Sequence, residues 1–321
     1  MKQRRVVITG MGAVTPIGHT VPESWHAIRS GVCGVAPITS YDTAGAKVTL
    51  AAEIKDYRAE DFFDRREAKT LARFTQFALI AAREALTDAD FRAEQTDPDR
   101  CGVIVSSGIG ALNVTEEEHS RGLAKGFDRV SPFYIPMSIS NMAAGQVAID
   151  AGFRGPCSCP VAACAGGTYA VGDAFRAIRD GYADAILCGG TEASVTPLAM
   201  GGFTSMKALS TTTDPDCASI PFDARRSGFV MGEGAGILLL EELDAARSRG
   251  ARIYAEVTGY GATCDAYHMT APGLTAAAVP EPWPPHWRTA ARRRRKWTIS
   301  TPTAPPLPST TPERPPRLRQ C

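Results

Sequence analysis

One cysteine set among small residues is the group in this sequence most suited to covalent chemistry. The stretch VAACAGG at residues 161–167 places Cys164 between a short apolar run and the start of a predicted helix. A helix start offers the positive end of the helix dipole and free backbone N–H groups, and both favour thiolate over thiol. The thiolate is the nucleophile in acyl-transfer chemistry. The pattern therefore predicts a reactive Cys164, although a small buried cysteine with no reaction fits it as well.

The segments around Cys164 have the periods of a helix and of buried strands. Downstream, apolar residues recur on one side of a predicted helix and charged residues on the other: Ala170, Val171, Ala174, Phe175 and Ile178 against Asp173, Arg176, Arg179 and Asp180. Four continuous apolar runs of strand length alternate with helical patterns, at residues 6–9, 102–105, 185–190 and 237–241. This alternation is typical of an α/β fold with a mostly parallel sheet covered on both faces.

Composition and short motifs argue against several other classes of protein. The net charge is +1, which gives no sign of nucleic-acid binding, and no apolar run approaches the length of a membrane span. The nine Cys lack paired metal-ligand spacing, as expected of a reduced cytoplasmic protein, and no signal peptide is predicted. The segment GMGAVTP at residues 10–16 lacks the third glycine of a dinucleotide-binding loop.

Several motifs together resemble the β-ketoacyl-ACP synthases, most closely the elongating synthases of dissociated fatty acid synthesis. They include GP, ACA and GDAFR at residues 155–156, 163–165 and 172–176, SSGIG at 106–110, and RRSGFVMGEGAG at 225–236. The similarity extends from Arg5 to about Pro272. It departs from the family at Ala162, where Thr is usual, and at Gly166, where Thr or Ser is usual. We expect glycine at position 166 to loosen the helix start.

The resemblance implies a thiolase-like fold, of which this chain holds the N-terminal half and only the start of the C-terminal half. We expect residues 1–250 to form the N-terminal half, a mixed, mostly parallel sheet covered by helices. We expect residues 251–273 to begin the second half, with a strand within residues 252–261. The reaction it implies has two stages and needs no metal or organic cofactor. Cys164 takes an acyl group from acyl carrier protein, and malonyl carrier protein then loses CO₂ and attacks the thioester.

The resemblance also implies substrate-binding residues and partners. Residues matching Ile109, Tyr134 and Phe203 border the acyl pocket in the family, and Thr270 lies in a segment beside the pantetheine channel. Tyr134 stands where a second Phe is common, so its hydroxyl is expected to alter the preferred chain length. The implied partners are acyl carrier protein and acyl and malonyl thioesters, with a homodimer for the intact family member.

A basic surface is predicted near the start of a long amphipathic helix over residues 64–86. Its basic face consists of Arg65, Arg66, Lys69 and Arg73. Such a face is usually solvated surface. In this family, however, it resembles the dock for the acidic carrier protein, to which Arg129 and Lys207 are predicted to contribute.

The chain changes character after Gly273. Residues 274–321 contain none of the 30 Gly and 11 of the 23 Pro, and they carry nine Arg or Lys against two Glu. Such a basic, proline-rich segment fits a disordered tail or a nucleic-acid patch. A shift of reading frame explains it better. Moving the frame of residues 297–308 back by one base permits VDYINAHGTSTP, the family's first catalytic-histidine motif.

Neither of the family's two catalytic-histidine motifs is present as written. The five histidines are His19, His26, His119, His268 and His286, and all lie outside such motifs. We therefore expect the chain to have the ancestry of a 3-oxoacyl-ACP synthase without completing the condensation. Two alternatives remain open: the condensing subunit of an aromatic polyketide pathway, and a non-catalytic fragment or partner subunit.

Overall fold

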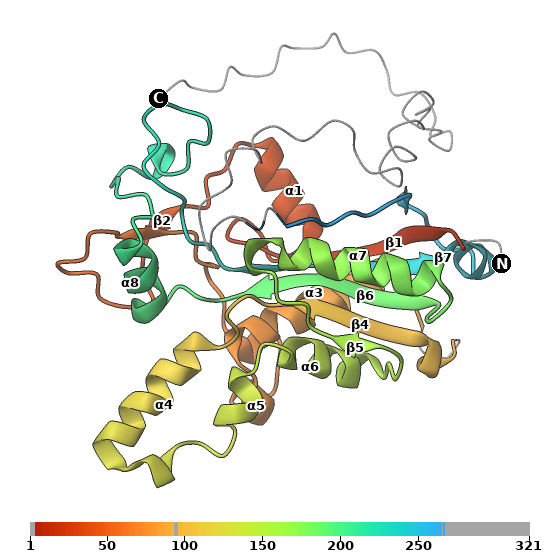
Figure 1. Cartoon of the computed structure of the whole chain (residues 1–321), viewed down its shortest axis with the longest axis horizontal. Helices are drawn as coiled ribbons and strands as arrows, with labels where there is room; N and C mark the ends of the chain where they lie inside the picture. Colours follow the sequence, from red (N-terminus) through yellow and green to blue (C-terminus); the bar gives the residue numbers. More distant parts are fainter. Residues whose placement is uncertain (1–3, 93–95, 265, 267–321) are drawn as a thin grey trace. The chain divides into compact units, whose positions relative to one another are not determined.

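Strands and helices alternate along the chain much as the sequence predicts. The computed structural model describes residues 4–92, 96–264 and 266 (Figure 1). Its helices are α1 Val21–Arg29, α2 Arg65–Ala68, α3 Arg73–Asp88, α4 Leu112–Lys125, α5 Tyr134–Ser138, α6 Met142–Ala151, α7 Gly166–Arg179, α8 Pro197–Ser205 and α9 Leu243–Ser248. Its strands are β1 Val6–Val14, β2 Ala36–Pro37, β3 Leu50–Ala51, β4 Cys101–Ser106, β5 Cys157–Ser158, β6 Ala185–Glu192, β7 Gly234–Glu242 and β8 Ala255–Val257.

Six of these strands form one mixed sheet in the order β5-β4-β6-β7-β1-β8. β4 pairs in parallel with both β5 and β6, whereas β7 is antiparallel to β6 and to β1. Consequently β5, β4, β6 and β1 share one direction, and β7 and β8 run the other way. The predicted mixed, mostly parallel sheet is confirmed.

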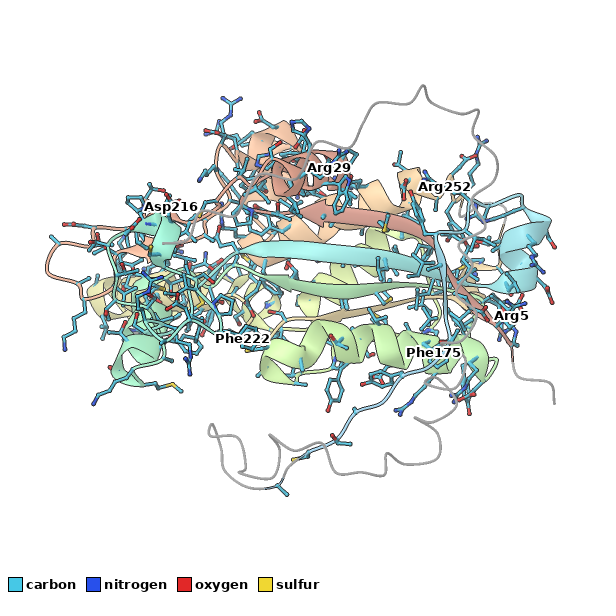
Figure 2. The ribbon with its side chains drawn as sticks, turned by 90° about the horizontal axis from the view of Figure 1, so that it is seen from above. Arg5, Arg29, Phe175, Asp216, Phe222 and Arg252 are labelled. Atoms are coloured by element: carbon cyan, nitrogen blue, oxygen red, sulfur yellow. The ribbon has the colours of Figure 1, made fainter. Side chains whose placement is uncertain are left out.

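Helices cover both faces of this sheet, which explains why the central stretches of β4, β6 and β7 are apolar. α3 and α6 contact one face, where Val103, Leu187 and Leu239 belong to the main core. α7 lies along the other side of the strands, as Figure 2 shows for the helix that carries Phe175. Ile186, the residue before Leu187 in β6, is fully buried. Because side chains alternate between the faces of a strand, a sheet covered on both sides needs an apolar residue at nearly every position.

The first strand extends through the glycine pair that resembles a nucleotide loop. A Cβ at Gly10 would lie 2.1 Å from the Ala85 carbonyl oxygen, and one at Gly12 would lie 1.9 Å from that of Ala81. Only glycine therefore lets α3 cross β1 at this distance. The GMG motif serves helix-sheet packing, in agreement with our rejection of a dinucleotide site.

The predicted long helix over residues 64–86 is wrong in one respect, because the structure divides it. α2 ends at Ala68 and α3 begins at Arg73. The Gln76 side-chain amide, which belongs to α3, donates to the carbonyl oxygens of Ala68 and Leu71, at 3.1 and 2.9 Å. A side chain thus satisfies carbonyls that a continuous helix would have bonded itself. The apolar period persists across the break, so periodicity alone does not reveal it.

The chain divides into two units, Met1–Thr258 and Gly259–Cys321, and every helix and strand named above lies in the first. The strand predicted within residues 252–261 is β8, which pairs with β1 at the edge of the main sheet. The predicted start of a second half stays a prediction, and residues 265 and 267–273 of that segment, like the tail at 274–321, lie outside the described residues. Among the residues described, no helix is long and apolar enough to span a membrane.

Candidate active site around Cys164

Cys164 lies on a strained turn at the start of α7. A single 3-10 turn, Ala163–Ala165, precedes the helix, and the Ala165 N–H donates to the Ala162 carbonyl oxygen at 3.1 Å. Ala163 has φ of 46°, a left-handed conformation that a residue with a Cβ rarely adopts. Such strain persists only where surrounding structure enforces it, and it gathers at functional sites. The turn leaves the Cys164 side chain exposed.

Ser106, at the end of β4, packs against this turn and hydrogen-bonds to the segment before it. The Ser106 hydroxyl donates to the Pro160 carbonyl oxygen at 2.7 Å, and Ser106 is only 3% exposed. A Cβ on Gly166 would lie 2.0 Å from the Ser106 Oγ atom. Glycine is thus required at position 166 because Ser106 occupies the space beside it. The expectation that Gly166 merely loosens the helix start overlooks this contact.

A cavity of about 450 Å³ opens beside Cys164. It lies at one edge of the sheet, where β4 and β6 end and β7 begins, which is the usual position of ligand sites in α/β proteins. Its apolar walls include Ile109, Phe203, Phe229 and Met231. Its size and lining suit an elongated apolar group bound next to the thiol.

One carboxylate also borders this cavity. Glu192, the last residue of β6, accepts hydrogen bonds from the backbone N–H groups of Gly108 and Ile109, at 2.9 and 3.2 Å. Its second oxygen accepts from the Ser194 hydroxyl at 2.8 Å and from the Ser107 hydroxyl at 3.4 Å. The carboxylate therefore ties the turn after β4 to the end of β6.

Two other cysteines are poor competitors for this chemistry. Cys188 and Cys101 lie in strands and are 0% and 1% exposed, and burial raises the pKa of both thiols. None of the other five described thiols lines the cavity, although Cys33, Cys157 and Cys264 are exposed and Cys159 and Cys217 are half-buried. Accessibility and location together single out Cys164 among the described thiols.

The predicted pocket residues fall into three groups. Ile109 and Phe203 line the cavity together with Cys164. Tyr134 does not; it lines a separate cavity of about 730 Å³ with His119, Phe127 and Leu198. Thr270 lies outside the described residues. The roles proposed for these side chains stay predictions.

The predicted docking residues are all on the surface. Arg65 and Arg66 belong to α2, Lys69 follows it directly, Arg129 ends a 3-10 turn, and Lys207 follows α8; all five are exposed. Asp64 starts α2 by accepting from the Arg66 and Glu67 N–H groups.

Arg73 does not belong to this exposed face, contrary to the sequence prediction. Its guanidinium forms an ion pair at 2.8 Å with Glu233, whose side chain is 4% exposed, and lies over the rings of Tyr57 and Phe77. Arg73 is therefore half-buried and pairs with a buried carboxylate next to the segment that leads into β7.

The sequence of residues 3–246 matches the family described as "Beta-ketoacyl synthase, N-terminal domain". That range contains Cys164, its turn and every strand of the main sheet except β8. The chain belongs to the β-ketoacyl synthase family. The predicted resemblance is confirmed.

Two bacterial β-ketoacyl synthases illustrate how close the similarity is. The 3-oxoacyl-(acyl-carrier-protein) synthase 2 of Synechocystis sp. is 50% identical over 273 residues, which are 85% of this chain and 66% of the relative. The protein of the same name from Staphylococcus aureus is 50% identical over 271 residues, 84% of this chain and 66% of the relative. The chain spans about two thirds of the length of these curated relatives.

Solved β-ketoacyl synthase structures confirm the fold class. The ishigamide ketosynthase/chain length factor gives a TM-score of 0.78 at 35% identity, covering 84% of this chain and 66% of that one. A β-ketoacyl synthase from Burkholderia phymatum gives 0.76 at 33% identity, covering 84% and 66%. A type II polyketide acyl carrier protein in complex with its ketosynthase gives 0.74 at 35% identity, covering 84% and 65%. The sheet described above is therefore that of the thiolase-like ketosynthases.

Several residues at the site were not predicted. Phe229, Met231 and Glu192 line the cavity, and Ser106 supports the nucleophile turn. The sequence pattern could have indicated Glu192, because this carboxylate ends a continuous apolar strand. In α/β sheets, ligand sites lie at the carboxyl ends of such strands. Among the described residues, no group of three or more His, Cys, Asp or Glu is arranged to hold a metal ion.

Proposed function

We propose that this chain is a 3-oxoacyl-ACP synthase of fatty acid biosynthesis, with Cys164 as the residue that carries the acyl group. The observation that supports this most is that an exposed cysteine on a strained turn before α7 lines a cavity with apolar walls. The 50% identity to proteins named 3-oxoacyl-(acyl-carrier-protein) synthase 2 supports the same substrate class.

In the first stage, the Cys164 sulfur attacks the thioester carbonyl carbon of acyl carrier protein. A new C–S bond forms at Cys164 as the bond to the carrier sulfur breaks, and the carrier thiol leaves with the proton that Cys164 gives up. The start of the 14-residue α7 interacts favourably with negative charge on the sulfur. The apolar side chains of Ile109 and Phe203 then accommodate the acyl chain.

In the second stage, malonyl carrier protein loses CO₂, and the resulting enolate carbon attacks the acyl-Cys164 carbonyl, releasing the thiolate. The enolate oxygen needs hydrogen-bond donors, and removing a single donor of this type costs about 2.7–4 kcal/mol. None of the histidines in the described part of the chain lines the cavity. We therefore propose that the 321-residue chain stops at the acyl-enzyme.

We propose acyl carrier protein as the partner, docked on Arg65, Arg66 and Lys69 with contributions from Arg129 and Lys207. The exposure of these cations and the similarity to a ketosynthase solved with its acyl carrier protein support this. We also propose a homodimer for the intact family member. A cytoplasmic location follows because a nucleophilic thiol must stay reduced.

A condensing role in a type II polyketide pathway is the nearest alternative. The solved ketosynthases that support this alternative are 35% identical to this chain, whereas the proteins named 3-oxoacyl-ACP synthase are 50% identical to it. Fatty acid synthesis is therefore the better supported pathway. A non-catalytic partner subunit would share the fold but would not need an accessible cysteine beside an apolar cavity.

The test compares the 321-residue chain with the product of a gene in which the predicted reading frame is restored. We expect the restored protein to release CO₂ from malonyl carrier protein and to elongate an acyl carrier protein. We expect the 321-residue chain to take up the acyl group without elongating it. Elongation by the 321-residue chain would contradict the proposed role of the missing histidines. Failure of the restored protein to elongate any acyl chain would contradict the proposed function.

A further inference from the structure

Glu192 joins two of the segments that build the Cys164 cavity. It ends β6, and one carboxylate oxygen accepts from the backbone N–H groups of both Gly108 and Ile109. The same turn carries Ser107, whose hydroxyl accepts from the Gly110 N–H at 3.0 Å. The turn after β4 is thus closed by one side-chain carboxylate from a neighbouring strand and one hydroxyl of its own.

This turn lies near Ala163, the residue that precedes the nucleophile. A Cβ at Gly108 would lie 3.3 Å from the nearer Glu192 oxygen and 3.9 Å from the backbone of Ala163. The Gly108 backbone is therefore held between the carboxylate and the residue that precedes Cys164. The next residue, Ile109, lines the cavity and is 38% exposed, so few contacts of its own side chain fix its position.

We propose that Glu192 is a positioning residue: it fixes the Gly108–Ile109 backbone, so that the Ile109 side chain forms a rigid wall of the cavity and limits which acyl chains reach Cys164. The inference rests on the proposed function in taking an acyl chain as the ligand. Two backbone donors on one oxygen hold the two successive peptide groups, Ser107–Gly108 and Gly108–Ile109, that flank Gly108. Without that acceptor, the two N–H groups turn toward water and the wall becomes mobile.

The test measures how the alkylation rate of Cys164 depends on chain length in the full 321-residue chain. N-alkyl iodoacetamides with two to sixteen carbons react with the thiol, and peptide mass spectrometry gives the rate constant for adduct formation at Cys164. The wild-type rate should pass through a maximum along the series. Glu192→Ala should flatten the profile, reducing the ratio between the fastest and slowest probe at least threefold. Because unfolded chain reacts with every probe regardless of its length, each profile is measured only on samples whose circular dichroism matches that of the wild type.

Two variants separate positioning from general damage. Glu53 is a matched control, because it also accepts from two successive backbone N–H groups, those of Thr39 and Ser40, but does not line this cavity. Glu53→Ala should keep the wild-type profile. Ile109→Ala should flatten the profile by itself, and adding Glu192→Ala to it should change nothing further, since contacting residues that act through one element are not additive.

Conservative variants keep the test decisive if Glu192→Ala does not fold. Glu192→Gln retains an oxygen for the two N–H groups and should keep the profile. Glu192→Asp is one methylene shorter and should flatten it. A folded Glu192→Ala or Glu192→Asp with the wild-type profile would overturn the inference, as would equal flattening by Glu53→Ala.

Acyl transfer from acyl carrier protein, measured on the same wild-type sample, distinguishes this inference from the proposed function. A Glu192-dependent profile without acyl transfer supports the positioning role and contradicts the proposed function. Acyl transfer together with a chain-length profile that Glu192→Ala leaves unchanged supports the proposed function and contradicts the positioning role.

Discussion

Gly166 offers a sharp test of how the nucleophile turn is held. In Gly166→Ala the new Cβ would lie 2.0 Å from the Ser106 Oγ atom and 3.0 Å from its Cβ atom. Carbon atoms in contact are normally about 3.5–4.0 Å apart, so Ser106 must rotate or the helix start must shift. Rotation breaks the 2.7 Å hydrogen bond from Ser106 to the Pro160 carbonyl oxygen.

These contacts determine how much Gly166→Ala lowers the free energy of unfolding. Overpacking costs about 1–3 kcal/mol. Leaving the buried Ser106 hydroxyl without its acceptor costs about 1–3 kcal/mol more. The higher helix propensity of Ala returns at most about 1 kcal/mol. We expect Gly166→Ala to lower the free energy of unfolding by about 3 kcal/mol, which lowers Tm by roughly 6–12 °C in a domain of this size.

Urea unfolding followed by circular dichroism measures this change, and the rate of Cys164 alkylation reports on the turn itself. Ser106→Gly in the Gly166→Ala background should recover about 1–2 kcal/mol, because the two side chains compete for one space. Gly201 is the matched control: it lies within α8, and a Cβ there meets nothing within 4 Å. Gly201→Ala should be neutral or stabilising. If Gly166→Ala is as stable as Gly201→Ala, or Ser106→Gly restores nothing, the packing argument is wrong.

Two further predictions concern charge. Reversal at Arg66 and Lys69 should weaken binding of acyl carrier protein at least tenfold in a titration and reduce its salt dependence, since exposed charges are screened beyond about 8–10 Å near physiological ionic strength; an unchanged affinity would exclude this surface. The hydrogen bond from Arg100 holds the pKa of Asp184 below its ordinary value of 3.8, against an opposing effect of burial. The resulting stabilisation is present above that pH and lost as pH falls below it, so Asp184→Asn should show a shallower loss of Tm between pH 5 and pH 2.5 than the wild type; equal slopes would contradict this.

The sequence predicted the local features of the site better than its long-range contacts. The small residues around Cys164 and the period of the following helix are local signals, and α7 and the exposed thiol agree with them. Continuous apolar strands likewise predicted a sheet covered on both faces. Ile109 and Phe203 reach the same cavity, as the family resemblance implies.

Contacts between distant segments account for what was not predicted. The need for glycine at position 166 comes from Ser106, 60 positions earlier, and neither residue signals the other in any periodic pattern. The split of the helix at residues 69–72 involves the Gln76 amide, while the half-buried position of Arg73 involves its ion pair with Glu233. Because Arg73 follows other basic residues in the sequence, it is predicted to be exposed unless its contact with the distant Glu233 carboxylate is known.

The central claim is that Cys164 accepts an acyl group from acyl carrier protein, and intact-mass spectrometry of the 321-residue chain tests it most directly. After incubation with acyl carrier protein bearing a saturated chain, we expect the mass of one added acyl group. Peptide mapping should locate it on Cys164, hydroxylamine should remove it as expected of a thioester, and Cys164→Ala should not acquire it. An acyl group on another cysteine, or none on a folded wild-type chain, would contradict the account.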